Sequence, residues 1–129
     1  MIFDLDDTLR HNHPHAHHFF GDFVRSLGLN LDEEALREAF RWGHRYWATS
    51  EDLLADIKEH GGYEEPFWQN YTRRHLEALG LDSEEIETYA PDVHKHMSKQ
   101  YRPESRLMSG AKETLRQLRQ AGYLTGLLT

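Results

Sequence analysis

Two aspartates near the start of the chain have the residue types and the spacing for catalytic or metal-binding chemistry. Asp4 and Asp6 follow the apolar residues Met1 to Phe3. In an extended segment alternate side chains share a face, so the two carboxylates point the same way. Paired carboxylates repel each other unless a cation lies between them, and oxygen ligands at the end of a strand suit Mg²⁺. The spacing is therefore compatible with a magnesium site.

The same pair could divide the work of a covalent reaction. One carboxylate can attack an electrophile while its neighbour transfers a proton, and Thr8 can fix the turn by hydrogen bonding to the backbone. The alternative is an acidic, solvated strand end with a capping threonine. Residue spacing alone leaves both interpretations open.

Few elements are available to position these side chains. Met1 to Phe3, ending at Asp4, predicts a short buried strand, and Tyr123 to Thr129 predicts a second one. We expect these to be the only two strands. Apolar spacing and capping residues predict helices between them, at Ala16 to Leu27, after Asp32, after Ser50 up to Gly61, from about Glu65 to Leu79, from Asp82 or Ser83, and from Ser109 to Gly122.

Composition excludes several classes of protein. The chain has 129 residues, 38% of them hydrophobic, which allows one domain with a real core or a small domain with an insertion. Its 15 basic and 22 acidic residues leave a net charge of −7, which disfavours nucleic-acid binding. No apolar run approaches a membrane span, and neither a secretion signal nor cysteine is present. We expect a soluble, cytoplasmic protein.

Both ends of the chain resemble one known family. IFDLDDTL resembles the first motif of the haloacid dehalogenase superfamily: an apolar strand, then Asp, any residue, Asp, any residue, Thr and Leu. SGAKETLRQLRQAGYLTGLLT resembles the helix and strand that lead to the second motif, which would end here at Thr129. The middle of the chain matches only as a helical insertion between the two motifs.

The resemblance implies an α/β fold with a Rossmann-like parallel-sheet core and an inserted all-helical cap. Only two core strands would be present, lying side by side. Residues 1–11 and 105–129 would form the partial core, and residues 12–104 the cap. The active site would lie at the carboxyl ends of the strands.

The resemblance also implies a role for each motif residue. Asp4 would be the nucleophile that forms an aspartyl-phosphate, and Asp6 the acid and base. Asp4 and Asp6, the latter through its backbone carbonyl, would bind Mg²⁺, while Thr129 would bind the phosphoryl group and Thr8 would support the loop. An acid at position 6 favours phosphoryl transfer over dehalogenation. The expected substrate is a small-molecule phosphate ester, and the oligomeric state stays open.

The family pattern continues beyond the last residue given. The family's third motif supplies a Lys and its fourth supplies acidic metal ligands, and both would follow Thr129. We therefore expect that residues 1–129 hold half of a phosphatase site and are inactive alone, because phosphoryl transfer depends mainly on electrostatic stabilisation. The alternative is a non-catalytic helical fragment or interaction module whose terminal strands complete another chain's sheet.

A histidine-rich stretch follows the first motif. HNHPHAHH contains His11, His13, His15, His17 and His18. These residues could bind a soft metal such as zinc or nickel, or could form a polar loop leading to a helix. In the family this stretch forms a flap over the site, so a histidine could also contact substrate. A histidine-rich metal carrier would bind zinc even without Asp4 and Asp6.

Two further groups of residues have alternative interpretations. Arg41 and Arg45, with His44 between them, and likewise Arg73 and Arg74, could meet a second anionic group on a substrate, although solvent-facing charges are the simpler interpretation. Six aromatic residues at helical spacing could form a ligand-stacking box, but we expect them to pack a helical core. They are Trp42, Tyr46, Trp47, Phe67, Trp68 and Tyr71.

Overall fold

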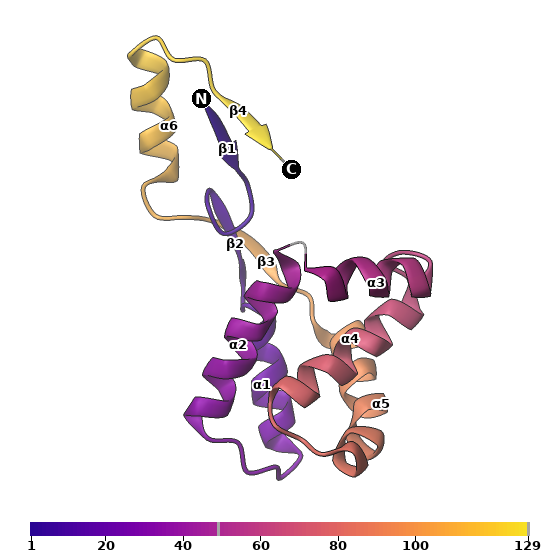
Figure 1. Ribbon diagram of the computed structural model, residues 1–129. Coiled ribbons are helices and arrows are strands. Elements are labelled where there is room, and N and C mark those ends of the chain that lie inside the picture. The colour runs from indigo at the N-terminus through magenta and orange to yellow at the C-terminus, as the bar shows by residue number, and fades with distance from the viewer. Residues whose placement is uncertain (49, 129) are drawn as a thin grey trace. The chain divides into compact units, whose positions relative to one another are not determined.

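The computed structural model describes residues 1–48 and 50–128, which contain six helices and four strands (Figure 1). In chain order these are β1 (Ile2–Asp4), β2 (Arg10–His13), α1 (Ala16–Ser26), α2 (Glu33–Trp47), α3 (Glu51–His60), α4 (Glu65–Ala78), α5 (Ser83–Gln100), β3 (Glu104–Leu107), α6 (Ala111–Gln120) and β4 (Gly126–Leu128). The chain divides into two compact units. The strand unit comprises Met1–His18 and the residues from Arg102 onward, and the helical unit is Phe19–Tyr101.

The first and last strands of the chain are paired in parallel, as predicted (Figure 1). The register places Ile2 opposite Gly126 and Asp4 opposite Leu128. Parallel strands need a long crossover connection, and here nearly the whole chain lies between them. The mixed α/β class of the fold is therefore confirmed.

The expected number of strands is wrong, because β2 and β3 form a second, antiparallel pair. Arg10 lies opposite Leu107 and His13 opposite Glu104. Both strands are short and polar, so neither has the apolar alternation that identifies a strand in sequence. Their pairing joins two segments that are far apart in the chain.

The helices begin where their capping residues predict. Side chains of Asp32 and Ser50 accept hydrogen bonds from the backbone of the first turns of α2 and α3. Asp82, rather than Ser83, is the N-cap of α5, and it forms a capping box with Glu85. Helix α6 begins after Gly110, one residue later than expected.

Two hydrophobic clusters form the core of the helical unit. The larger one joins α1, α2, α4 and α5 and contains Phe20, Val24, Ala39, Leu76, Leu79, Leu81, Ala90 and Val93. The smaller one contains Tyr46, Leu53 and Phe67, with Trp42, Ile57 and Tyr71 packed against it. Core packing is thus confirmed for four of the six aromatic residues. Trp47 and Trp68 are 40% and 41% exposed at its edge.

The sequence predicts that the first strand is buried, but in the structure this strand is largely exposed. Ile2 is 74% exposed, and Leu128 on the neighbouring strand is 65% exposed. A parallel sheet normally buries both faces under helices and further strands, whereas β1 has β4 as its one neighbour among the described residues. The apolar residues of these strands therefore remain open to solvent.

A buried ion pair ties α3 to α4 and α2. Asp56 is only 2% exposed. Arg74 donates from Nη2 to its Oδ1 at 2.9 Å, and the hydroxyl of Tyr46 donates to Oδ2 at 2.8 Å. Burial alone would raise the pKa of Asp56, but the hydrogen bonds from Arg74 and Tyr46 and the charge of Arg74 together hold it below its usual value. The carboxylate is thus ionised and fully engaged in the fold.

No helix in the described part of the chain combines the length and apolar character needed to cross a bilayer.

Leu76→Ala should destabilise the helical unit by about 3 kcal/mol, because it removes a fully buried side chain from the larger cluster and leaves a cavity. Leu54, on α3, is 54% exposed, so Leu54→Ala is the matched control and should cost well under about 1 kcal/mol. Urea unfolding followed by circular dichroism measures both. Equal losses for the two variants would contradict this assignment of the core.

Asp56→Asn should lower the free energy of unfolding by about 3 kcal/mol at pH 7, because it leaves Arg74 without its carboxylate partner. Since the pKa of Asp56 is lowered by folding, its contribution is complete above the unfolded value of about 3.9 and is lost as pH falls below it. The gap between the wild type and the variant in urea unfolding should therefore narrow progressively as the pH is lowered below that value.

The matched control is Asp52→Asn. Asp52 lies 4.0 Å from Arg74 and its side chain is 67% exposed, so its removal should cost less than about 1 kcal/mol. A gap between wild type and Asp56→Asn that stays constant from pH 7 to pH 3 would contradict the role of the ionised carboxylate.

Candidate active site

The carboxylate of Asp4 is oriented by a neighbouring threonine. Asp4 is the last residue of β1, and the hydroxyl of Thr8 donates to its Oδ2 at 3.2 Å. Backbone hydrogen bonds from Leu9 and Arg10 to the carbonyl of Leu5, at 3.0 and 3.1 Å, close the loop between them. Thr8 therefore contacts the carboxylate itself, whereas the sequence suggested a bond to the backbone.

The turn after Asp6 has an unusual backbone conformation. Asp7 has φ of 58°, in the left-handed region, and its N–H donates to the carbonyl of Arg10 at 2.7 Å. Gly adopts this conformation freely, and Asn and Asp adopt it more readily than other residues do. The backbone conformation at position 7 is therefore one that Asp tolerates and that Gly would adopt without strain.

Asp6 has a cationic partner that sequence reasoning missed. Arg10, the first residue of β2, places its Nε 2.8 Å from Asp6 Oδ1. Both side chains are accessible, at 74% for Asp6 and 42% for Arg10. The spacing of four residues between opposite charges was a signal in the sequence, but such a spacing is informative mainly in helices. Asp4 and Asp6 are thus held by different partners, Thr8 and Arg10.

The predicted phosphate-binding threonine cannot be placed. Thr129 lies outside the described residues. Its neighbour Leu128 pairs with Asp4 in the β1–β4 register. The carboxyl ends of the two strands therefore lie at the same edge of the sheet.

The donor set at the end of β1 suits a hard divalent cation. Asp4 and Asp6 offer carboxylate oxygens, both residues are exposed, and the loop brings backbone carbonyls to the same segment. Another group of possible ligands, Asp56, Glu59 and His60, has ligand atoms within 4.8 Å of one another on α3. Asp56 is 2% exposed and is bound by both Arg74 and Tyr46, so its carboxylate is inaccessible to a cation and that group is a poor cation site.

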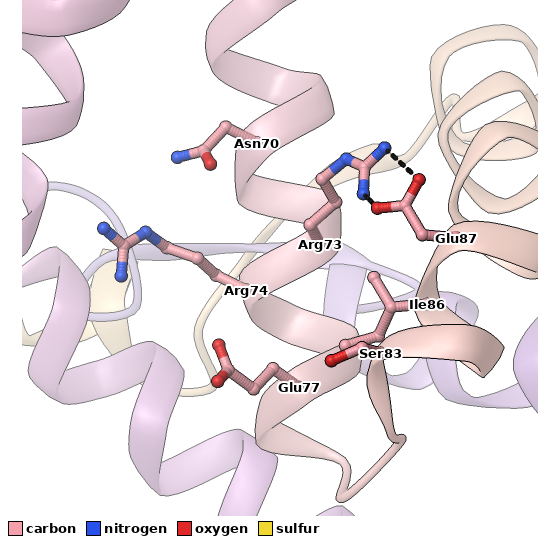
Figure 2. Close-up of a pocket in the computed structure, with 7 residues that line it drawn as sticks. All are labelled: Asn70, Arg73, Arg74, Glu77, Ser83, Ile86 and Glu87. Atoms are coloured by element: carbon pink, nitrogen blue, oxygen red, sulfur yellow. Dashed lines mark hydrogen bonds and ion pairs between the residues drawn. The ribbon is translucent and has the colours of Figure 1, made fainter.

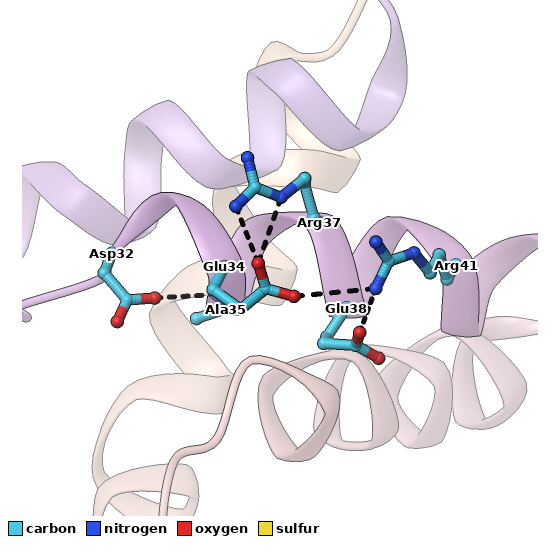
Figure 3. A network of polar contacts seen from close by, with 6 residues as sticks. All are labelled: Asp32, Glu34, Ala35, Arg37, Glu38 and Arg41. Carbon is cyan, nitrogen blue, oxygen red and sulfur yellow. Dashed lines mark hydrogen bonds and ion pairs between the residues drawn. The ribbon is translucent and has the colours of Figure 1, made fainter.

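Three of the four arginines considered as anion-binding residues, Arg41, Arg73 and Arg74, are paired with carboxylates. Arg73 forms an ion pair with Glu87 across an open groove of about 320 Å³ between α4 and α5 (Figure 2). Arg41 contacts both Glu34 and Glu38 along α2 (Figure 3). Arg74 is bound to Asp56. These contacts support the simpler interpretation, in which the arginines form ion pairs on the helices rather than a site for an anionic group.

Asp7→Gly should be tolerated or slightly stabilising, because Gly adopts the left-handed conformation without steric cost. Asp7→Val should destabilise the strand unit by about 1–2 kcal/mol, since a β-branched residue is strongly disfavoured there. Hydrogen exchange of the amide of Arg10, which lies in the loop, measures local opening in both variants. Faster exchange in Asp7→Gly than in Asp7→Val would contradict the observed turn.

Comparison with known proteins identifies the family. No significant match to a curated protein was found for the chain. The family model for haloacid dehalogenase-like hydrolases matches residues 1–129. Because this match includes both terminal strands, the DLDDT loop and the helical insertion between them, the chain belongs to the haloacid dehalogenase-like hydrolase family.

Proposed function

We propose that this hydrolase cleaves phosphate monoesters with the help of Mg²⁺, using Asp4 as nucleophile. The observation that carries the proposal is the orientation of the Asp4 carboxylate at the end of β1, where Thr8 holds its Oδ2 at 3.2 Å. The hydrogen bond leaves Oδ1 as the attacking atom. A second carboxylate two residues later, at Asp6, is the feature that the family's phosphatases need and its dehalogenases do not.

In the first step, Oδ1 of Asp4 attacks the phosphorus in line with the ester oxygen. The new bond is an aspartyl-phosphate, and the bond that breaks joins phosphorus to the ester oxygen of the substrate. Asp6 gives its proton to that departing oxygen.

In the second step, Asp6 takes a proton from a water molecule, which attacks the phosphorus of the phosphorylated Asp4. Inorganic phosphate leaves and the Asp4 carboxylate is restored. Asp4 and the backbone carbonyl of Asp6 would hold the cation, and when bound Mg²⁺ would offset charge on the phosphoryl oxygens. We propose Thr129 as a hydrogen-bond donor to the same oxygens, and Thr8 as the residue that keeps Asp4 in place.

The proposed substrate is a small phosphate ester. Residues 12–104 are proposed as a cap over the site, and a helical cap suits small molecules better than polymers. The net charge of −7 also argues against a nucleic-acid substrate. A cytoplasmic location is a prediction based on the cysteine-free composition.

Hydrolysis of p-nitrophenyl phosphate by the protein tests the proposal. Asp4→Asn should reduce kcat by about 10³-fold or more, because it removes the nucleophile. Asp6→Asn should reduce it by about 10²–10⁴-fold, because it removes proton transfer. EDTA should abolish the activity and Mg²⁺ should restore it.

Asp7→Asn is the matched control, since Asn also tolerates the left-handed conformation and Asp7 has no role in the proposed reaction. It should retain activity within about threefold. A beryllium fluoride adduct at Asp4 would identify the nucleophile directly. Activity that survives Asp4→Asn would refute the mechanism.

A second candidate is a non-catalytic module whose terminal strands complete another chain's sheet. The exposed apolar residues of the strand unit favour it, since Ile2, Leu124 and Leu128 are all more than half exposed. The same assay discriminates between the two functions. Hydrolysis that depends on Asp4 supports the enzyme, whereas an inactive gene product supports the module.

A further inference from the structure

Four histidine side chains gather within the strand unit. The ring of His15 lies 5.4 Å from that of His11, 5.6 Å from that of His17 and 6.2 Å from that of His18, measured between ring centres. We call these four residues the histidine cluster. His15 is its centre, because each of the other three rings contacts it.

Two elements of secondary structure determine where these rings lie. His11 belongs to β2, and its pairing opposite Arg106 of β3 holds its backbone. His17 and His18 lie in the first turn of α1, and His15 comes directly before that helix. The cluster therefore combines a ligand from a paired strand with ligands from a helix, so that it is more than a flexible run of histidines.

The ring of His11 contains a nitrogen without a hydrogen bond. Its Nδ1 is shielded from solvent and has no hydrogen-bond partner in the described part of the chain. A buried polar atom without a partner costs free energy, so native structures rarely contain one. Neutral imidazole nitrogen is also the commonest protein ligand for transition metals.

The distances from the ring centre of His15 to its three neighbours are of the size that two ligands of one metal ion require. Zinc binds histidine nitrogen at about 2.0–2.1 Å, which places the ring centres of two ligands on one tetrahedral ion about 5–6 Å apart. The three pairs that include His15 are close to this range. His17 and His18 are only 4.1 Å apart, so one of them, not both, fits beside His15.

No three nitrogens of the cluster lie within 4.8 Å of one another as the rings now stand. Binding therefore requires the rings to rotate about their side-chain bonds. His18 is exposed and His15 and His17 are half-buried, so rotation does not require the core to rearrange. The backbone positions of β2 and α1 can stay unchanged.

We propose that the histidine cluster binds a Zn²⁺ ion through His11, His15 and either His17 or His18, with water completing a tetrahedral shell. Imidazole ligands select zinc over Mg²⁺, whereas the carboxylates of Asp4 and Asp6 have the opposite preference. The site is therefore distinct in chemistry from the proposed magnesium site. It extends the family function by a second metal centre built from the segment after the first motif.

Titration of the whole gene product with ZnCl₂ tests the proposal, with binding followed by calorimetry and with Co²⁺ as a spectroscopic probe of tetrahedral geometry. The wild type should bind one Zn²⁺ saturably. His15→Ala and His11→Ala should each weaken Zn²⁺ binding by about tenfold or more. Removing a metal ligand lowers the metal affinity at least as much as removing a residue that only supports a ligand. The double variant of His17 and His18 should do the same.

His13→Ala is the matched control. His13 belongs to the same stretch and is exposed, but it makes no ring contact with the cluster, so its loss should leave the affinity unchanged. His15→Gln serves as a second variant if His15→Ala does not fold, as judged by circular dichroism. Asp4→Asn and Asp6→Asn should abolish phosphatase activity yet keep zinc binding, which separates this proposal from the proposed function.

Either of two results would overturn the proposal. One is the absence of saturable Zn²⁺ binding by the folded wild type. The other is an equal loss of affinity in His13→Ala and His15→Ala, because that result would show only the general affinity of histidine-rich segments for metals.

Discussion

The parallel pairing of β1 with β4 is the constraint on which the candidate active site depends. It brings Asp4 opposite Leu128, so the strand that ends at Asp4 lies beside the strand that leads to the predicted second motif, although almost the whole chain separates them. Closing so long a loop costs conformational entropy, but this cost grows only slowly with loop length. The helical insertion has its own core and can therefore be large without preventing the strands from pairing.

The two units use different sources of stability. The helical unit buries Phe67, Leu76, Val24 and Val93 completely and adds the Asp56–Arg74 ion pair between α3 and α4. The strand unit has little buried apolar surface, and short backbone ladders hold it together. The loop that follows β1 in this unit is held by local contacts. These contacts set the positions of Asp4 and Asp6. Several arginines on the helices, among them Arg41, Arg73 and Arg74, form ion pairs with neighbouring carboxylates.

Sequence reasoning recovered the elements that depend on local signals. The helix starts at Asp32 and Ser50 follow from capping chemistry, and the strand before Asp4 follows from an apolar run that meets acidic residues. It missed β2 and β3, because polar four-residue strands have no pattern of their own and depend on pairing. It also missed the contact between Arg10 and Asp6, since a loop gives no rule for which charge a side chain will meet.

The sequence by itself determined the family, the mixed α/β class, the helices of the insertion and the residue types that can perform the chemistry. These features depend on local periodicity, capping and a short motif, all of which are properties of adjacent residues. Only the tertiary structure decided that Thr8 binds the carboxylate of Asp4, that Arg74 is bound to a buried Asp56, and that four histidines gather around His15. Each of these depends on how side chains meet once strands pair and helices pack, and spacing along the chain does not specify that.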